Sequence, residues 1–235
     1  MSKLTCYLAL FSLPVVFLLV LNPVEFWWGF KTAGKPVPMP PDVDRSVTIG
    51  GRYTFLAKEA MLIALMWIFM RANSVSATSI GLWSSHWKFD LAVGCLGAVA
   101  LIGIQVASSR ITKSPLGDAG RMRKLYGYHG RLLFWIPANI FGPVAEEFWR
   151  AFCIFAFVSA GYSVSVAVVL TALAFGLGHI GLGLPAALAV ATVGLGFALL
   201  YTWTGSLLAP FVAHSFANLH ILYQAKCAPE MVAHR

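Results

Sequence analysis

Three short groups of polar residues in the second half of the chain have the types and the spacing that hydrolytic chemistry needs. They are two glutamates followed by an arginine, a phenylalanine followed by a histidine, and a histidine followed by an asparagine: Glu146, Glu147 and Arg150; Phe175 and His179; His214 and Asn218. Residues three or four apart project from one face of a helix, so each group can present its side chains together. We therefore expect three helices to turn these groups toward one interior pocket.

The chemistry that these residue types can perform is the hydrolysis of a peptide bond. A glutamate held near a histidine can act as a general base and polarise a water molecule. A second histidine and an asparagine amide can donate hydrogen bonds to the oxyanion that develops on the attacked carbonyl group. An arginine paired with one carboxylate keeps that carboxylate ionised and fixed in place. Together, the three groups favour a hydrolytic site.

The segments that must position these groups are long and apolar. Hydrophobic residues make up 59% of the 235 positions and charged residues 11%, against about 25% charged residues in ordinary soluble domains. The apolar runs approach the ~20 residues that cross the hydrocarbon core of a bilayer as a helix. We predict an all-α, polytopic transmembrane helical bundle of about seven spans, within a range of six to eight. The expected spans cover residues 4–21, 54–70, 91–107, 132–158, 164–180, 185–203 and 206–224.

These spans divide the chain into three parts. Residues 1–75 hold two spans and a proline-rich loop, residues 76–225 form the core with the polar groups, and residues 226–235 are a short polar tail. A signal peptide is the alternative for the first apolar run, but its length and the lack of a small-residue cleavage site favour an uncleaved span. In the second span, Lys58 and Glu59 lie near the expected start, where the lysine can extend to the interface.

The net charge of +8 is distributed between the apolar runs. Nucleic-acid binding needs a contiguous basic surface, so we expect no nucleic-acid partner. Lysines and arginines beside membrane helices set their orientation, and the most basic stretch, residues 108–131, is expected on the cytoplasmic side. Three spans precede that stretch, so the amino terminus is expected outside. We expect an integral, multi-pass protein of a plasma or inner membrane, in contact with its lipids.

Ionisable side chains inside such spans indicate function, because each costs about 2.5–3.5 kcal/mol or more at mid-bilayer. The structural alternatives are an ion pair that joins the glutamates to Arg150, and interhelical hydrogen bonds from His179, His214 or Asn218. Each alternative explains one group. A shared pocket explains all three.

No cofactor is expected from the spacing. The sequence lacks the H-E-x-x-H helix of zinc hydrolases, and its intramembrane histidines lie on separate spans. A zinc ion held by one glutamate and two histidines from three helices is geometrically feasible, but the spacing does not signal it. A haem group between His179 and His214 is a further alternative, which leaves the two glutamates and the arginine unexplained.

At these residues the chain resembles the CAAX-processing and bacteriocin-processing intramembrane proteases, the CPBP family. Members carry three motifs in order: E-E-x-x-x-R, F-x-x-x-H and H-x-x-x-N. The second and third match residues 175–179 and 214–218, and the sequence G-S-L-L-A-P at 205–210 resembles the family's approach to the third. The first motif departs from the family pattern. The segment Glu146-Glu147-Phe148-Trp149-Arg150 has two residues between the glutamate pair and the arginine, where the family has three.

The resemblance implies an integral-membrane endopeptidase of the glutamate type that cuts a peptide or protein substrate near the membrane surface, including C-terminally tagged or lipidated substrates. It implies that Glu146 or Glu147 activates water with His179, that His214 and Asn218 stabilise the oxyanion, and that the arginine and Phe175 support them. We predict Glu146 as the base, because either alignment of the shortened motif keeps it within the acid pair. The alternative is a catalytically silent relative that acts as an immunity factor or membrane scaffold.

Overall fold

The computed structural model describes residues 1–21, 45–112, 132–180 and 184–227. These residues form seven α-helices and one short 3₁₀ turn, and they contain no strand, which confirms the all-α prediction. The elements are α1 (Lys3–Leu21), α3 (Arg45–Ala72), η1 (Thr78–Ile80), α4 (Trp87–Thr112), α6 (Leu132–Ser159), α7 (Val164–Gly178), α8 (Leu184–Thr204) and α9 (Leu208–Cys227). Most of the proline-rich connection and of the basic 108–131 stretch lies outside the described residues.

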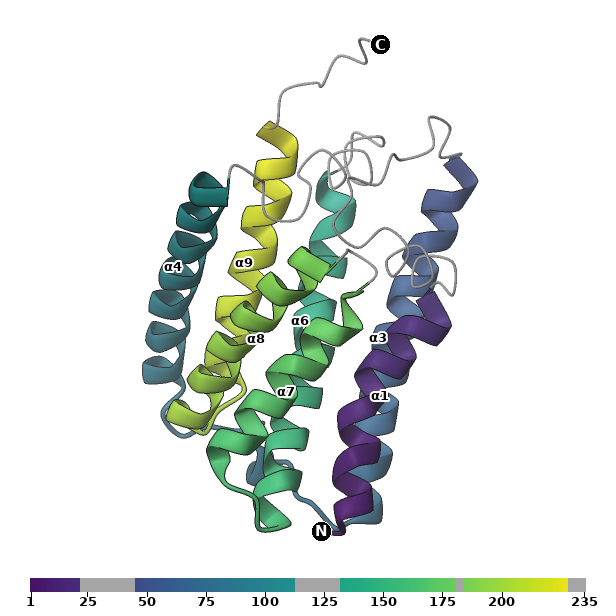
Figure 1. The fold of residues 1–235 in the computed structure, drawn as a ribbon, viewed down its shortest axis with the longest axis vertical. Coiled ribbons are helices and arrows are strands. Elements are labelled where there is room, and N and C mark those ends of the chain that lie inside the picture. Colours follow the sequence, from purple (N-terminus) through teal and green to yellow (C-terminus); the bar gives the residue numbers. More distant parts are fainter. Residues whose placement is uncertain (22–44, 113–131, 181–183, 228–235) are drawn as a thin grey trace.

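Successive helices run in opposite directions along the long axis of the bundle (Figure 1). The first residues of α1 and α9 therefore lie at one end, and the start of α3, the end of α4 and the start of α6 lie at the other. The ends of α3 and α4 therefore lie at opposite ends of the bundle, as the expected succession of spans requires. The helix α7 is short, and it ends below the level that α6 and α9 reach in this view.

The core lies between α1, α3, α6 and α7, where apolar side chains such as Leu13, Met66 and Phe152 are fully buried. Two polar contacts lock α1 onto α6. The indole nitrogen of Trp149 donates to the carbonyl oxygen of Ala9 at 2.9 Å, and the thiol of Cys6 donates to the carbonyl oxygen of Ala156 at 3.3 Å. The amino-terminal helix is thus an integral member of the bundle.

A close backbone contact sets the start of α9, the helix that carries His214. Gly81 has a φ of 74°, in the left-handed region that favours glycine, and its carbonyl oxygen accepts from Leu207 N at 2.9 Å. A Cβ atom at Gly81 would lie 2.2 Å from the carbonyl oxygen of Gly205. The loop after η1 can therefore press against the α8–α9 turn only because this residue is a glycine.

Lys58 and Glu59 contradict the expectation that the lysine extends to an interface. Both side chains are buried, and the ammonium nitrogen lies 2.7 Å from a carboxylate oxygen of Glu59. The reason is the length of the helix: α3 begins at Arg45, well before the predicted start of the span at residue 54, so both residues lie near its middle.

Within the described residues, two helical segments are long and apolar enough to cross a membrane, Trp87–Ala107 and Ala186–Thr204. Two further apolar segments, Lys3–Phe17 and Val164–Gly178, are shorter. Helix α6 is also long, but it is not among these apolar segments, and it contains two glutamates and an arginine in its middle.

Candidate active site

The centre of the site is a bidentate ion pair within α6. Arg150 donates from Nε to Glu147 Oε2 at 2.9 Å and from Nη2 to Glu147 Oε1 at 3.3 Å. Both side chains are fully buried. A guanidinium group that donates hydrogen bonds to both oxygens of a carboxylate fixes the orientation of that carboxylate and balances its negative charge.

The neighbouring helices hold Arg150 in place. Its Nη1 donates to the carbonyl oxygen of Gly194 in α8 at 3.2 Å, and its guanidinium carbon lies 4.4 Å from the centre of the Phe175 ring in α7. A Cβ atom at Gly194 would lie 2.7 Å from the Phe175 ring and 3.4 Å from Arg150 Nη1. Gly194 therefore allows the backbone of α8 to approach the cluster.

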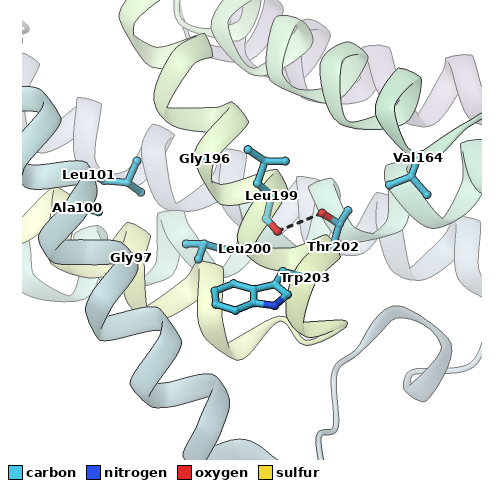
Figure 2. Close-up of a pocket in the computed structure, with 9 residues that line it drawn as sticks. All are labelled: Gly97, Ala100, Leu101, Val164, Gly196, Leu199, Leu200, Thr202 and Trp203. Atoms are coloured by element: carbon cyan, nitrogen blue, oxygen red, sulfur yellow. Dashed lines mark hydrogen bonds between the residues drawn. The ribbon is translucent and has the colours of Figure 1, made fainter.

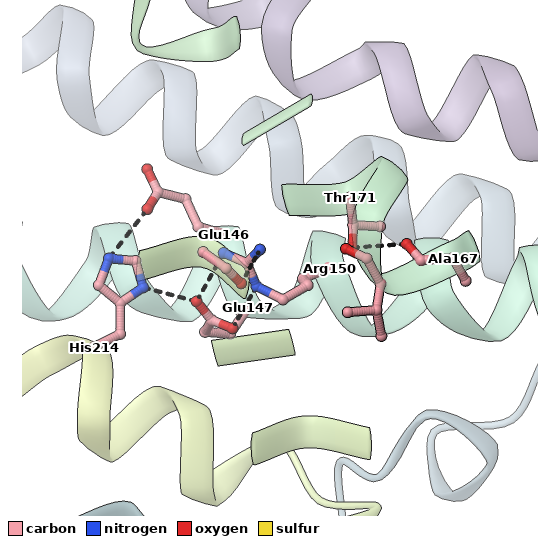
Figure 3. Close-up of polar contacts among 8 residues, drawn as sticks. Glu146, Glu147, Arg150, Ala167, Thr171 and His214 are labelled. Atoms are coloured by element: carbon pink, nitrogen blue, oxygen red, sulfur yellow. Dashed lines mark hydrogen bonds and ion pairs between the residues drawn. The ribbon is translucent and has the colours of Figure 1, made fainter. Parts of the chain in front are cut away.

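His214 of α9 bridges the two glutamates (Figure 3). Its Nδ1 lies 2.7 Å from Glu147 Oε1, and its Nε2 lies 3.5 Å from Glu146 Oε2. Since an ionised carboxylate only accepts hydrogen bonds, Nδ1 carries a proton and donates a hydrogen bond to Glu147. The imidazole ring stacks on Phe197 of α8, with ring centres 4.4 Å apart, and this contact fixes the plane of the ring.

The two glutamates have different surroundings, although they are adjacent in sequence. Glu147 accepts from Arg150 and His214, so both of its oxygens are committed. Glu146 is also buried, but its only ion-pair contact among the described residues is the longer one with His214. Glu146 is therefore the carboxylate with oxygen atoms available to a water molecule.

His179 lies just past the end of α7, half-buried, and contacts neither glutamate among the described residues. Its Nδ1 is 2.8 Å from the carbonyl oxygen of Phe175, so Nδ1 carries the proton and Nε2 is the acceptor nitrogen. The Phe175 ring lies edge-on to both histidines, 4.7 Å from the His179 ring and 5.9 Å from the His214 ring. The resemblance implied that His179 would contact the acid pair. In the structure, His214 makes that contact instead.

Asn218 lies on α9 one turn beyond His214 and is half-buried. Its side chain forms no hydrogen bond with another described residue, so its amide group is available to a ligand. Of the predicted residues, the structure joins the glutamates, Arg150, Phe175 and His214 by direct contacts. His179 and Asn218 lie beside this group.

Two residues that contact the cluster and two charged residues of the helix packed on α6 were not among the predicted site residues. Gly194 and Phe197 of α8 carry no signal, because a glycine and a phenylalanine are ordinary in an apolar helix. Lys58 and Glu59 of α3 did carry one, as two adjacent charges within an apolar run. The rule that charges inside such runs indicate function applies to them as it does to the α6 cluster.

A second feature, a groove of about 570 Å³ between α4 and α8, lies apart from this cluster (Figure 2). Its walls are apolar, with Leu101, Leu200 and Trp203 among the residues that line it. The hydroxyl group of Thr202 is bonded within its own helix, to the carbonyl oxygen of Leu199 at 3.1 Å. The groove offers no group that could perform acid–base chemistry. Elsewhere too, the described residues contain no cluster of three or more His, Cys, Asp or Glu side chains arranged to hold a metal ion.

Comparison with known families identifies the part of the chain that carries the cluster. A family profile described as type II CAAX prenyl endopeptidase Rce1-like matches residues 128–220, which contain α6, α7, α8 and most of α9. A search of curated proteins and a search of solved structures each found no match. Residues 128–220 of the chain are thus similar to the Rce1-like family, which confirms the resemblance stated from its motifs.

Proposed function

We propose that this protein is a membrane-embedded endopeptidase of the glutamate type, which hydrolyses a peptide bond in a peptide or protein substrate. The observation that carries the proposal is the buried cluster of Glu146, Glu147, Arg150 and His214 within a segment that matches a protease family. Buried charges contribute little to stability even when they are well paired, so a cluster of this size indicates a use beyond packing.

A multi-pass arrangement in a bilayer accounts for the outer surface of the bundle. Large apolar side chains are exposed along α1 and α4, namely Leu4, Leu8, Phe11 and Val15, and Leu96, Val99 and Ile104. Soluble monomers rarely expose contiguous apolar surfaces of this kind. The exposed Trp87 and Trp203 lie at the start of α4 and the end of α8, at the same end of the bundle (Figure 1), as in an interfacial aromatic belt.

The charges of the cluster support a proton shared between Glu146 and His214. Glu147 is balanced by Arg150, so Glu146 needs a positive charge of its own in a low-dielectric interior. A proton on His214 Nε2, facing Glu146 Oε2, supplies that charge. Glu147 stabilises the resulting imidazolium through Nδ1. In this state every charge in the α6–α9 cluster has a partner.

The proposed reaction begins with a water molecule beside Glu146. Glu146 takes a proton from the water as the water oxygen attacks the carbonyl carbon of the substrate. The oxyanion that forms accepts hydrogen bonds from His214 Nε2 and from the Asn218 amide. The carbon–nitrogen bond then breaks as Glu146 passes its proton to the leaving amine, and the new carboxylic acid keeps the oxygen of the water. His179 Nε2, an acceptor nitrogen, orients the same water from the side of α7.

Cleavage by the purified protein in lipid vesicles tests this proposal. The probes are two quenched fluorescent peptides of one sequence, one ending in a farnesylated cysteine motif and the other unmodified. We expect the natural protein to cleave at least one of them and Glu146→Gln to cleave neither. Thr171→Val is a matched control, because the hydroxyl group of Thr171 is buried in α7 and bonded to backbone oxygens of its own helix. Equal cleavage by Glu146→Gln and the natural protein would exclude this mechanism.

The silent-relative alternative rests on the shortened first motif. The structure weakens that argument, because Arg150 still reaches both oxygens of Glu147 at a spacing of three residues. The haem alternative is weakened as well, since both ring nitrogens of His214 already face carboxylates. Failure of the natural protein to cleave either peptide, with Glu146→Gln showing the same cellular phenotype, would favour the silent relative.

A further inference from the structure

Two aromatic rings from different helices contact the imidazole ring of His179. The ring of Phe175 in α7 lies 4.7 Å from it, and the ring of Phe17 in α1 lies 5.4 Å from it, both in edge-to-face arrangements. Aromatic pairs of this geometry are favourable at ring-centre distances of about 4.5–7 Å. His179 follows the last residue of α7, where the helix backbone no longer continues around it. The contact with Phe17 therefore supplies support that α7 alone lacks.

A close approach of α1 to the end of α7 fixes the position of the Phe17 ring. A Cβ atom at Gly178, the residue before His179, would lie 2.5 Å from a methyl carbon of Leu13 and 3.4 Å from the Phe17 ring. The Phe17 side chain is 5% exposed, and the ammonium nitrogen of Lys58 lies 3.5 Å from the centre of its ring. A cation over an aromatic face is attracted to it. The ring is therefore held by α1, α3 and α7 together.

The orientation of the His179 ring decides which of its nitrogens carries the proton. Nδ1 lies 2.8 Å from the carbonyl oxygen of Phe175 and donates to it, which leaves Nε2 as the acceptor. In the part of the chain that the structure describes, Nε2 has no hydrogen-bond partner of its own. A ring that turns away from the carbonyl oxygen loses this bond, and a free imidazole ring prefers its proton on Nε2. That nitrogen then no longer accepts a hydrogen bond from water.

We propose that Phe17 is a positioning residue of the active site, and that its ring keeps Nε2 of His179 in the acceptor form that orients the attacking water. The inference rests on the proposed function, in which that nitrogen contacts the water beside Glu146. Helix α1 lies outside residues 128–220, so the amino-terminal helix completes a site that the family-like segment carries. Phe17 acts through His179 and does not contact the substrate.

Phe17→Leu tests the proposal, because it removes the ring and keeps a buried apolar side chain. We expect kcat in the vesicle assay to fall about two- to tenfold, the range that one aromatic contact accounts for, with KM within about twofold of its natural value. The flexible side chain of methionine fills irregular gaps, so Phe17→Met is the second variant if Phe17→Leu does not accumulate. A natural kcat in both variants overturns the proposal.

Two further substitutions in α1 separate positioning from packing. Leu10→Val shortens a buried side chain about two turns before Phe17 on the same face of the helix. This variant should lower the thermal midpoint of unfolding and leave kcat unchanged. Phe11→Leu makes the same substitution at an exposed phenylalanine of α1 and should change neither quantity. If Leu10→Val lowers kcat as much as Phe17→Leu does, the effect is one of packing and the proposal is wrong.

Nitrogen NMR of isotope-labelled histidine in vesicles separates this proposal from the proposed function, because it needs no substrate. Protonated and unprotonated ring nitrogens have different chemical shifts, and the signals of His179 are those that His179→Asn removes. Above the ordinary titration range of histidine, we expect the proton on Nδ1 in the natural protein and in Leu10→Val. In Phe17→Leu we expect a second population with the proton on Nε2.

An unchanged proton position in both Phe17 variants refutes the positioning role even if cleavage is observed. A changed position without any cleavage by the natural protein supports the role of Phe17 and counts against the protease assignment alone.

Discussion

Arg150 lies three residues after Glu147 and four after Glu146, and a helix allows an ion pair at either spacing. The structure forms the pair with Glu147, because Gly194 and Phe175 hold the guanidinium group on the side of α6 that Glu147 occupies. The shorter first motif is accommodated in this way: the arginine still binds the second acid and leaves the first one open. At the residue scale, the adjacent glutamates therefore have different partners.

Glu147→Gln should leave measurable activity and reduce stability. The substitution removes the charge that holds Arg150, and breaking one partner of a buried ion pair costs about 3–5 kcal/mol. Glu146 keeps its contact with His214, so the base remains. The measurements are the thermal midpoint of unfolding in detergent and the cleavage rate in vesicles. Complete loss of cleavage with unchanged stability would instead assign the base to Glu147.

His214→Ala and Asn218→Ala test the proposed oxyanion donors. Removing one such donor typically costs about 10²–10³ in rate, and the loss should appear in kcat more than in KM. Asn218 makes no hydrogen bond with the described residues, so its variant should accumulate normally and give the cleaner comparison. Natural cleavage rates in both variants would mean that neither residue contacts the oxyanion.

Helix α8 shows how an element without an ionisable group shapes the site. It contributes the carbonyl oxygen of Gly194, which accepts from Arg150, and the ring of Phe197, which stacks on His214. The first contact needs the backbone of α8 close to α6, and the second needs α8 close to α9. The glycine permits that approach, because a larger side chain would meet Phe175.

Gly194→Ala should destabilise the bundle and reduce cleavage together. The added methyl group would lie 2.7 Å from the Phe175 ring, and overpacking of this kind typically costs about 1–3 kcal/mol. Gly103→Ala in α4 is the matched control, because a Cβ atom there meets nothing within 4 Å. That variant should be neutral or slightly more stable, since alanine is the better helix former. The thermal midpoint and the cleavage rate are measured for both variants.

At the scale of the whole molecule, the cluster is buried within the bundle, and Phe175 in the last turn of α7 contacts His214 of the cluster. His179 sits at that end and is half-buried, whereas the glutamates and Arg150 are buried. Helix α7 runs toward the end of the bundle at which α4 ends and α6 begins, and α8 runs away from that end. In the proposed orientation that end is cytoplasmic, so we expect substrates to arrive from the cytoplasmic side.

Cysteine accessibility in intact cells tests the orientation. Single cysteines at Ser85, which is exposed between η1 and α4, and at Ser114, in the basic stretch, are compared in a background without Cys95 and Cys227, which leaves only the buried Cys6 and Cys153. An impermeant maleimide should label position 85 and leave position 114 unlabelled until the membrane is opened. The opposite pattern would reverse the orientation and place the opening of the site on the outer side.

The sequence alone was sufficient to predict the all-helical fold and to select the candidate residues of the site. Long apolar runs can form little besides helices, and a charged group within such a run stands out by composition. The family match over residues 128–220 confirms the resemblance on which those residues were chosen. The partners of these residues depended on the tertiary structure. On an isolated helix, Arg150 could pair with either glutamate, because the spacings of three and four residues both allow an ion pair. The packing of α8 and α9 on α6 decides that Arg150 and His214 both bind Glu147. The position of Lys58 and Glu59 was likewise decided by how α3 packs on α6, since no local pattern specifies which neighbour a buried charge faces.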